Sequence, residues 1–380
     1  MKSREVSMEK REILVRKLKD KDPSIFNMVV GFDGFVDEII HVVDKRQGPN
    51  DYTRVKTISD FAMKIDRASG LSSNIEFVPI KSKIGGNGPI MVNALIKHHP
   101  QITYIGTLGY PNIHQVFQPL VDKANVYTIE KYGDTQAVEF NDGKLIIGKM
   151  NNLVNVDYQH LIDIVPEAKL INLLSSTDLF SMVNWSMLPY MTDIWKNIIT
   201  RILPKISIKE HKPFLFIDIA DPEKREKKDI VEALNLLKSF KTHFKVILGL
   251  NKKEAYDVSV HLDLFEASEV KSKTLEEINR SLYRYLNIDY VVVHPVERSS
   301  VVFEDQYYEE NGPYISEPKL TTGAGDNFNA GLILGLLLGL NPDEALLTGM
   351  STSGYYVRNA DSPNYQQLSD FITNWIHNRI

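Results

Sequence analysis

Strand-like and helix-like segments alternate through the second half of the chain, and this alternation restricts the fold more than any other feature of the sequence. Apolar segments typical of strands lie at residues 168–174, 214–219, 245–250, 290–294 and 300–303. Segments typical of helices lie at 187–202, 227–240, 274–286, 327–340 and 343–356. Strands joined through helices run parallel, because the helix returns the chain to the edge of the sheet where the strand began. We therefore expect an α/β body with a doubly wound, mainly parallel sheet and helices on both faces.

The region before residue 150 has shorter strand-like segments and predicts a smaller β-rich cover. These segments lie at 41–43, 74–80, 102–105, 125–129, 136–140 and 145–149, with a helix expected over 89–98. Asn141-Asp142-Gly143 is typical of a hairpin turn. An amphipathic helix is expected at 8–20, before Pro23. We expect a helical extension over residues 1–24 and one body over 25–380, with lid segments drawn from about 35–60 and 75–150.

Composition excludes several classes of function. The chain has 380 residues and no Cys, so it has no disulfide, thiolate zinc site, Fe–S cluster or cysteine nucleophile. A formal net charge of −5 argues against a nucleic-acid or anionic-membrane surface. The longest apolar run, at 330–340, is shorter than the roughly 20 residues that cross a bilayer. The first 22 residues are charged and lack the apolar core of a signal peptide. A cytoplasmic protein that does not bind membranes is expected.

The strongest candidate for chemistry is TTGAGD at 321–326, which runs directly into the apolar segment 327–340. Gly323 and Gly325 allow close approach of the backbone, and the first N–H groups of a helix form an anion site at its positive end. With a phosphoryl group on those N–H groups, Asp326 could take a proton from an attacking hydroxyl. The alternative interpretation is a glycine-rich turn followed by a helix whose dipole Asp326 stabilises.

Two further loops carry polar groups suited to a polyhydroxyl ligand. GGNGP at 85–89 combines the bare backbone of Gly85 and Gly86 with the amide of Asn87, which both donates and accepts. Asp33 and Asp37 follow the first expected strand, at the edge where α/β sheets bind ligands. A tight turn and simple helix capping remain the alternatives for these two loops.

Asn251 and Glu254 follow the strand expected at 245–250. An Asn with a Glu three residues later is the ordinary start of a helix. The same two side chains could also orient waters around Mg²⁺. The segment 221–225 (DPEKR) is likewise an ordinary turn between a strand and a helix by its sequence alone.

Taken together and in this order, these motifs resemble the ribokinase-like (PfkB) carbohydrate kinase family over roughly residues 26–370. TTGAGDNFNAGL at 321–332 is similar to the family's C-terminal signature, and GGNGP lies where its di-glycine motif falls. Asn251 and Glu254 match the family's NxxE motif, and DPEKR looks like its frequent Asp-Pro turn. Some features, including GGNGPIMVNAL and His294 at a strand end, look like ADP-dependent sugar kinases of the same superfamily.

The resemblance implies transfer of the γ-phosphoryl group of ATP to a hydroxyl of a sugar. Asp326 would be the base, and the amides of Gly323, Ala324 and Gly325 would form the anion hole. Asp33, Asp37, Gly85, Gly86 and Asn87 would bind the acceptor. Asn251, Glu254, Thr322 and His294 would bind the nucleotide, with Mg²⁺ held by Asn251 and Glu254 through water. A homodimer formed through the lid is a further expectation.

Alternatives to an ATP-dependent sugar kinase stay open. They are a nucleoside or vitamin-precursor kinase, an ADP-dependent sugar kinase, and a catalytically lapsed sugar-binding regulator. Three positions depart from the family pattern. His294-Pro295-Val296 stands where the family usually has Thr-x-Gly after a strand on the nucleotide side. Leu320 stands where an acidic residue usually helps to bind a monovalent cation, and Ile90 replaces an Asn of the di-glycine motif.

Overall fold

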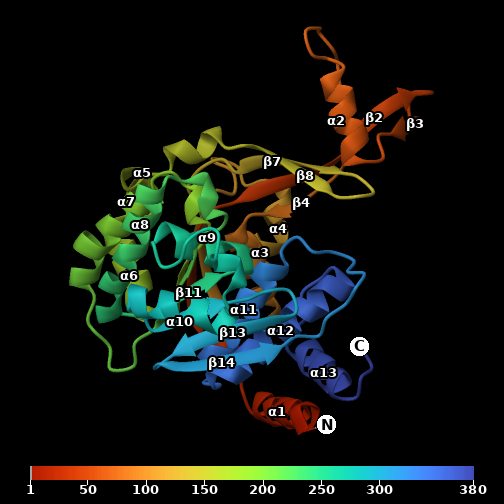
Figure 1. The fold of residues 1–380 in the computed structure, drawn as a ribbon. Helices are drawn as coiled ribbons and strands as arrows, with labels where there is room; N and C mark the ends of the chain where they lie inside the picture. Colours follow the sequence, from red (N-terminus) through yellow and green to blue (C-terminus); the bar gives the residue numbers. More distant parts are fainter. Residues whose placement is uncertain (1) are drawn as a thin grey trace.

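A nine-stranded sheet forms the centre of the protein (Figure 1), in a computed structural model that describes residues 2–380. Across the sheet the strands are β14 (Gln306–Asn311), β13 (Arg298–Phe303), β12 (Tyr290–Val293), β11 (Lys245–Leu250), β10 (Phe214–Asp218), β9 (Leu179–Met182), β1 (Asn27–Phe32), β5 (Gln101–Gly106) and β6 (Asn125–Thr128). The strands from β12 to β6 are parallel, and β13 and β14 join antiparallel at one edge. The predicted mainly parallel sheet is confirmed.

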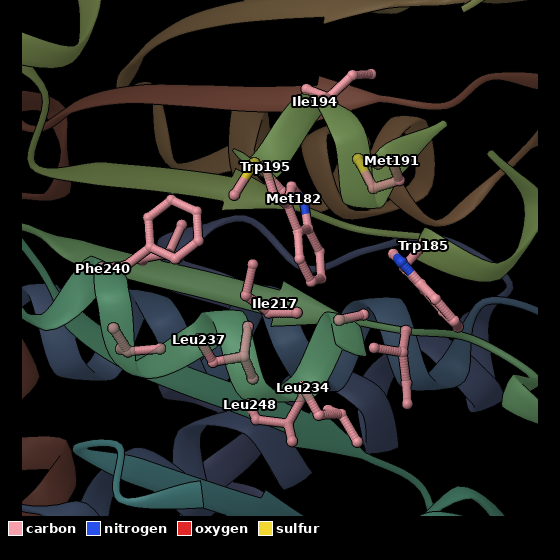
Figure 2. Packing of buried hydrophobic residues seen from close by; sticks show 14 of the residues in the cluster. Met182, Trp185, Met191, Ile194, Trp195, Ile217, Leu234, Leu237, Phe240 and Leu248 are labelled. Carbon is pink, nitrogen blue, oxygen red and sulfur yellow. The ribbon is translucent and has the colours of Figure 1, made fainter. Parts of the chain in front are cut away.

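Helices cover both faces of this sheet, as predicted. One face packs against α5 (Tyr158–Ile164), α6 (Glu167–Ser176), α7 (Met191–Asn197), α8 (Lys227–Leu236), α9 (Lys252–His261) and α10 (Leu275–Leu286). The other packs against α3 (Asn87–Leu95), α4 (Gln118–Val121), α11 (Ala324–Leu337) and α12 (Pro342–Asn359). Val29 joins the first core and Val30 the second, because successive strand residues point to opposite faces. Figure 2 shows the first core, where Trp185 and Trp195 are fully buried.

The N-terminal helix α1 (Lys2–Lys19) packs beside the C-terminal helix α13 (Tyr365–Ile376) (Figure 1). Leu14 and Leu18 are buried against Leu368 and Ile372. The helix expected at 8–20 is therefore present, and residue 1 of the predicted extension lies outside the described residues. The division of the chain into an extension and one body stays a prediction. Among the described residues, none of the helices combines the length and the apolarity needed to span a bilayer.

A second, smaller sheet stands over one edge of the body and is called the lid below. It contains β2 (Phe35–Arg46), β3 (Tyr52–Arg54), β4 (Phe77–Gly85), β7 (Gly133–Glu139) and β8 (Lys144–Lys149). The far end of β2, with β3 and α2 (Ile58–Asp66), forms an arm that extends away from the body (Figure 1). The arm has a separate, small hydrophobic core, to which Phe61 and Phe140 belong. Not all of the range 75–150 is lid, because β5 and β6 belong to the large sheet.

One predicted strand is wrong. Residues 168–174 lie in helix α6, and the strand of this unit is β9, which begins at Leu179. Leu170 and Leu174 are buried four residues apart, which is the spacing of one face of a helix. The apolar run alone does not distinguish a buried helix from a strand. The predicted hairpin at 141–143 is confirmed, because it joins the antiparallel strands β7 and β8.

Candidate active site

The glycine-rich turn at 321–323 leads directly into α11, as the sequence predicts. Gly323 caps the helix in the left-handed region, with φ 89°, where glycine has no steric penalty. A Cβ atom there would lie 3.0 Å from side-chain atoms of both Ile90 and Tyr356. Tyr356 also donates a hydrogen bond of 2.8 Å to the Thr322 carbonyl, which fixes the turn. The N–H groups of the first helical turn lack acceptors inside the helix and can bind an anion.

Asp326 lies in this first turn and is buried, with 8% of its surface exposed. Its Oδ1 accepts a hydrogen bond of 2.9 Å from the Asn87 side chain. Burial raises the pKa of Asp326 well above its ordinary value, and the nearby carboxyls of Asp218 and Asp33 raise it further. A carboxylate with an increased proton affinity suits a general base.

The GGNGP loop is held in place by Asp33. The backbone N–H groups of Asn87 and Gly88 donate to the two Asp33 carboxylate oxygens at 2.8 and 2.9 Å. The Asn184 side chain donates a third hydrogen bond, of 2.7 Å. Asp33 is fully buried, and burial raises its pKa to about 6. Its carboxylate is therefore engaged with protein donors, and Asn87 links it to Asp326.

A pocket of about 610 Å³ lies between the lid and the body and is called the lid pocket. The lid contributes Phe35, Asp37, Thr135, Ile146 and Gly148, and the body contributes Gly86, Asn87, Asn184, Asp221 and Glu254, among others. Asp37 accepts a hydrogen bond from Thr135 and lies opposite Lys83 on the neighbouring strand. Burial raises the pKa of Asp37, while the Thr135 hydrogen bond and the charge of Lys83 lower it. Gly85 packs so closely on the Asp37 carboxylate that a Cβ would collide with it.

A second pocket, of about 330 Å³, opens at the α11 N-terminus and is called the apolar pocket. Its lining includes His294, Pro295, Val296, Tyr314, Phe328 and Met350, with Thr321, Ala324 and Gly325 at the helix start. His294 stacks on Phe328, with ring centroids 4.7 Å apart. Burial lowers the pKa of His294 to about 4, so its imidazole is neutral at pH 7. A flat aromatic ligand such as a purine ring suits this surface.

Asn251 and Glu254 stand between the two pockets. Asn251 lines the apolar pocket and Glu254 the lid pocket. They form a capping box at the start of α9, in which Glu254 accepts from the backbone N–H of Asn251 at 2.8 Å. Glu254 also accepts from the Asp221 N–H at 3.2 Å. This geometry therefore fits both interpretations of the pair, as a helix cap and as residues that orient waters around Mg²⁺.

Sequence reasoning missed Asn184 and Asp218. Asn184 is in the left-handed region, is 3% exposed and lines the lid pocket. Its Oδ1 has no hydrogen-bond partner among the described residues. Asp218 accepts from the Asn329 side chain at 2.9 Å, and burial and the charge of Glu254 raise its pKa well above the ordinary value. Both residues stand at or just after the carboxyl end of a parallel strand, which is the signal that could have found them.

Solved structures of several kinases share this fold, and three of them are compared with this chain below. Adenosine kinase from Sinorhizobium meliloti superposes with a TM-score of 0.65 at 14% identity, covering 93% of this chain and 99% of that chain. Arabidopsis thaliana ribokinase complexed with ribose and ATP gives 0.62 at 14% identity, covering 92% and 99%. Ribokinase from Thermotoga maritima gives 0.59 at 17% identity, covering 92% and 100%. The predicted ribokinase-like fold is confirmed.

Sequence comparison is more specific than the fold. The ketohexokinase of Haloferax volcanii is 26% identical over 354 residues, which cover 92% of this chain and 91% of the relative. The family model described as Khk, prokaryotic ketohexokinase, matches residues 9–375. That match spans nearly the whole chain and agrees with the fold and with the predicted kinase motifs. The chain therefore belongs to the prokaryotic ketohexokinase family, a PfkB-type, ribokinase-like family of carbohydrate kinases.

Proposed function

We propose that this protein transfers the γ-phosphoryl group of ATP to a primary hydroxyl of a ketohexose, with Asp326 as the general base. The observation that carries this proposal is the position of Asp326 in the first turn of α11. Asn87, which lines the lid pocket, holds its carboxylate, and Gly325, the preceding residue, lines the apolar pocket. The names of the family and of the Haloferax volcanii relative support the choice of a ketohexose.

In the proposed step, the acceptor oxygen forms a bond to the γ-phosphorus while the bond from that phosphorus to the bridging oxygen of ADP breaks. The hydroxyl proton passes to the Asp326 carboxylate. The N–H groups of Gly323, Ala324 and Gly325 would stabilise the negative charge on the transferred group. The high proton affinity of Asp326 favours this transfer, because a base gains efficiency as its pKa approaches the working pH.

We assign the acceptor to the lid pocket. The Asp37 carboxylate would accept hydrogen bonds from sugar hydroxyls, and the Asn87 side-chain amide would donate to them. Gly85 and Gly86 would allow the sugar to approach the backbone closely. The Oδ1 atom of Asn184, which has no hydrogen-bond partner among the described residues, would accept a hydrogen bond from one more sugar hydroxyl. Asp33 was predicted to bind the acceptor directly; its complete burial and its hydrogen bonds from protein donors instead support a role in positioning Asn87 and Asn184.

We assign the nucleotide to the apolar pocket, with its base near His294 and its phosphates at the α11 N-terminus. Thr322 would act through its backbone, which Tyr356 fixes. The oxygen donors of Asn251 and Glu254 fit Mg²⁺, which binds nucleotide phosphates with few protein carboxylates and several waters. When bound, Mg²⁺ would neutralise phosphate charge.

A phosphorylation screen tests the proposal. Fructose, other ketohexoses, aldohexoses, ribose and adenosine would each be offered with ATP and, separately, with ADP. We expect turnover of a ketohexose with ATP and Mg²⁺, measured by coupled ADP release. Turnover of adenosine alone, or turnover only with ADP as the donor, would contradict the assignment.

We also propose that two chains associate through their lids. Exposed apolar side chains support this, since Ile80 on β4 and Ile147 on β8 are 45% and 44% exposed. Sedimentation velocity should show a dimer that Ile147→Asp weakens. A monomer at micromolar concentration would contradict the proposal.

A further inference from the structure

A third pocket, of about 460 Å³, shares Pro295 and Val296 with the apolar pocket, and we call it the cationic pocket. It is lined by Lys252 at the start of α9, by Lys271, Lys273 and Leu275 around the start of α10, and by Arg298 at the start of β13. Four of its side chains carry positive charge, and Glu297 is the single acidic side chain in its lining. Its volume is within the range of small-molecule sites.

Little of this positive charge is neutralised. Lys271 has no ion pair or hydrogen bond among the described residues. Lys252 lies over the Tyr256 ring, 5.6 Å from its centroid, and has no ion pair within residues 2–380. Lys273 has a distant carboxylate partner in Glu269, at 3.7 Å. Only Arg298 is closely paired, with Glu309 at 3.2 Å.

Exposed lysines repel one another, so a cluster of them around a hollow is stabilised when an anion binds there. The start of α10 also opens on this pocket, but Glu277 already accepts from the Thr274 N–H at 2.7 Å. The lysine side chains therefore carry the argument, and the helix end adds little. Lysine ammonium groups are common ligands of phosphate, which offers several acceptor oxygens at once.

We propose that the cationic pocket binds a small phosphate ester at a site separate from the one that holds the phosphoryl donor. Pro295 and Val296 line both the cationic pocket and the apolar pocket. A ligand here and a nucleotide there would both contact this loop. Binding in one pocket is therefore expected to change affinity in the other, and the coupling is reciprocal.

Calorimetric titration of the full chain with inorganic diphosphate tests the proposal. The titration is run without nucleotide and again in saturating ADP, which fills the donor site. We expect one diphosphate to bind in the presence of ADP. In the double variant Lys271→Glu/Lys273→Glu this binding should weaken by about 100-fold, because two attractive charges become repulsive.

The matched control is Lys123→Glu/Lys228→Glu, which changes the net charge equally at exposed lysines outside the pocket. It should keep the wild-type diphosphate affinity, and both double variants should keep sugar-kinase turnover. Loss of diphosphate binding on saturation with ADP would overturn the proposal, as would equal affinity in the two double variants. These binding outcomes do not depend on which sugar is phosphorylated.

Discussion

Four carboxyls, from Asp33, Asp218, Glu254 and Asp326, are buried close enough to affect one another's ionisation. Burial raises the pKa of each one, and the neighbouring negative charges add to the effect for Asp218 and Asp326. An isolated buried carboxylate would be costly, but each of these accepts at least one hydrogen bond. The cluster therefore keeps Asp326 a strong proton acceptor.

Asp326→Asn removes the proposed base while conserving shape. We expect kcat to fall by about 10²–10⁴-fold, the usual contribution of a general base. Nucleotide affinity should change little, because the backbone N–H groups of the α11 start remain. Steady-state kinetics with calorimetric ADP binding would check both values. A kcat near that of the wild type would remove Asp326 from the reaction.

The raised pKa of Asp326 predicts a pH dependence. Below this pKa the carboxyl already holds a proton and cannot accept another, so kcat/KM should fall as the pH falls through it. Because burial raises this pKa, the loss should occur above the ordinary range of an aspartate, near 4. A pH profile of kcat/KM for the acceptor measures the midpoint. A midpoint at about 4 or below would contradict the assigned environment.

Asp37→Ala should weaken acceptor binding. A hydrogen bond to a charged group contributes about 1.5–3 kcal/mol, so the acceptor KM should rise by about 10- to 100-fold. Thr135→Val is the matched comparison, because it keeps the Asp37 carboxylate, removes the hydroxyl that donates to it and to the Val36 carbonyl, and should have a smaller effect. The ATP KM should stay constant in both variants. Unchanged acceptor kinetics in Asp37→Ala would place the sugar elsewhere.

At the scale of elements, the α11 start depends on the conformation of one glycine. Gly323→Ala forces φ 89° on an alanine and brings its Cβ within 3.0 Å of Ile90 and Tyr356. Gly70→Ala is a clean control, since Gly70 has φ 74° and nothing within 4 Å of an added Cβ. We expect about 1 kcal/mol of destabilisation for Gly70→Ala and about 2–3 kcal/mol for Gly323→Ala.

Activity should separate these two variants further. Only Gly323→Ala disturbs the N–H groups proposed to hold the phosphoryl group, so it alone should lower kcat. Urea unfolding gives the stabilities, and turnover with ATP gives the activities. Equal losses in both variants would show that the turn at 323 has no role beyond its backbone conformation.

At the scale of the whole molecule, the lid pocket lies between the lid sheet and the loops and helix ends of the body. Asp37 and Thr135 come from the lid, whereas Asn184 and Glu254 come from the body. A ligand that contacts both parts stabilises their closed arrangement by mass action. Residues of α2, on the arm, line none of this pocket.

Hydrogen exchange can test that arrangement. With saturating ketohexose, amides of β7 and β8 should exchange more slowly, and amides of α2 should be unaffected. Mass-spectrometric exchange of the full chain, with and without sugar, makes the comparison within one molecule. Equal protection of α2 and β7 would indicate general tightening instead of lid closure.

The sequence itself determined the α/β alternation, the α11 signature and the order of the motifs. These signals are local, since a glycine-rich turn before an apolar helix is identified by its neighbours in the chain. Local periodicity failed at 168–174, where a short apolar run is compatible with a strand and with a buried helix. It also could not identify Asn184, whose importance comes from contacts with a residue 151 positions away.

Only the tertiary structure decided which polar residues face a pocket and which support it. Asp33 and Asp37 are four residues apart and similar in sequence context, yet one is enclosed by backbone donors and the other lines the lid pocket. The charge clustered around Lys271 was likewise invisible in a chain with a net charge of −5. Burial and through-space charge depend on long-range packing, and the linear order of residues does not specify their distances.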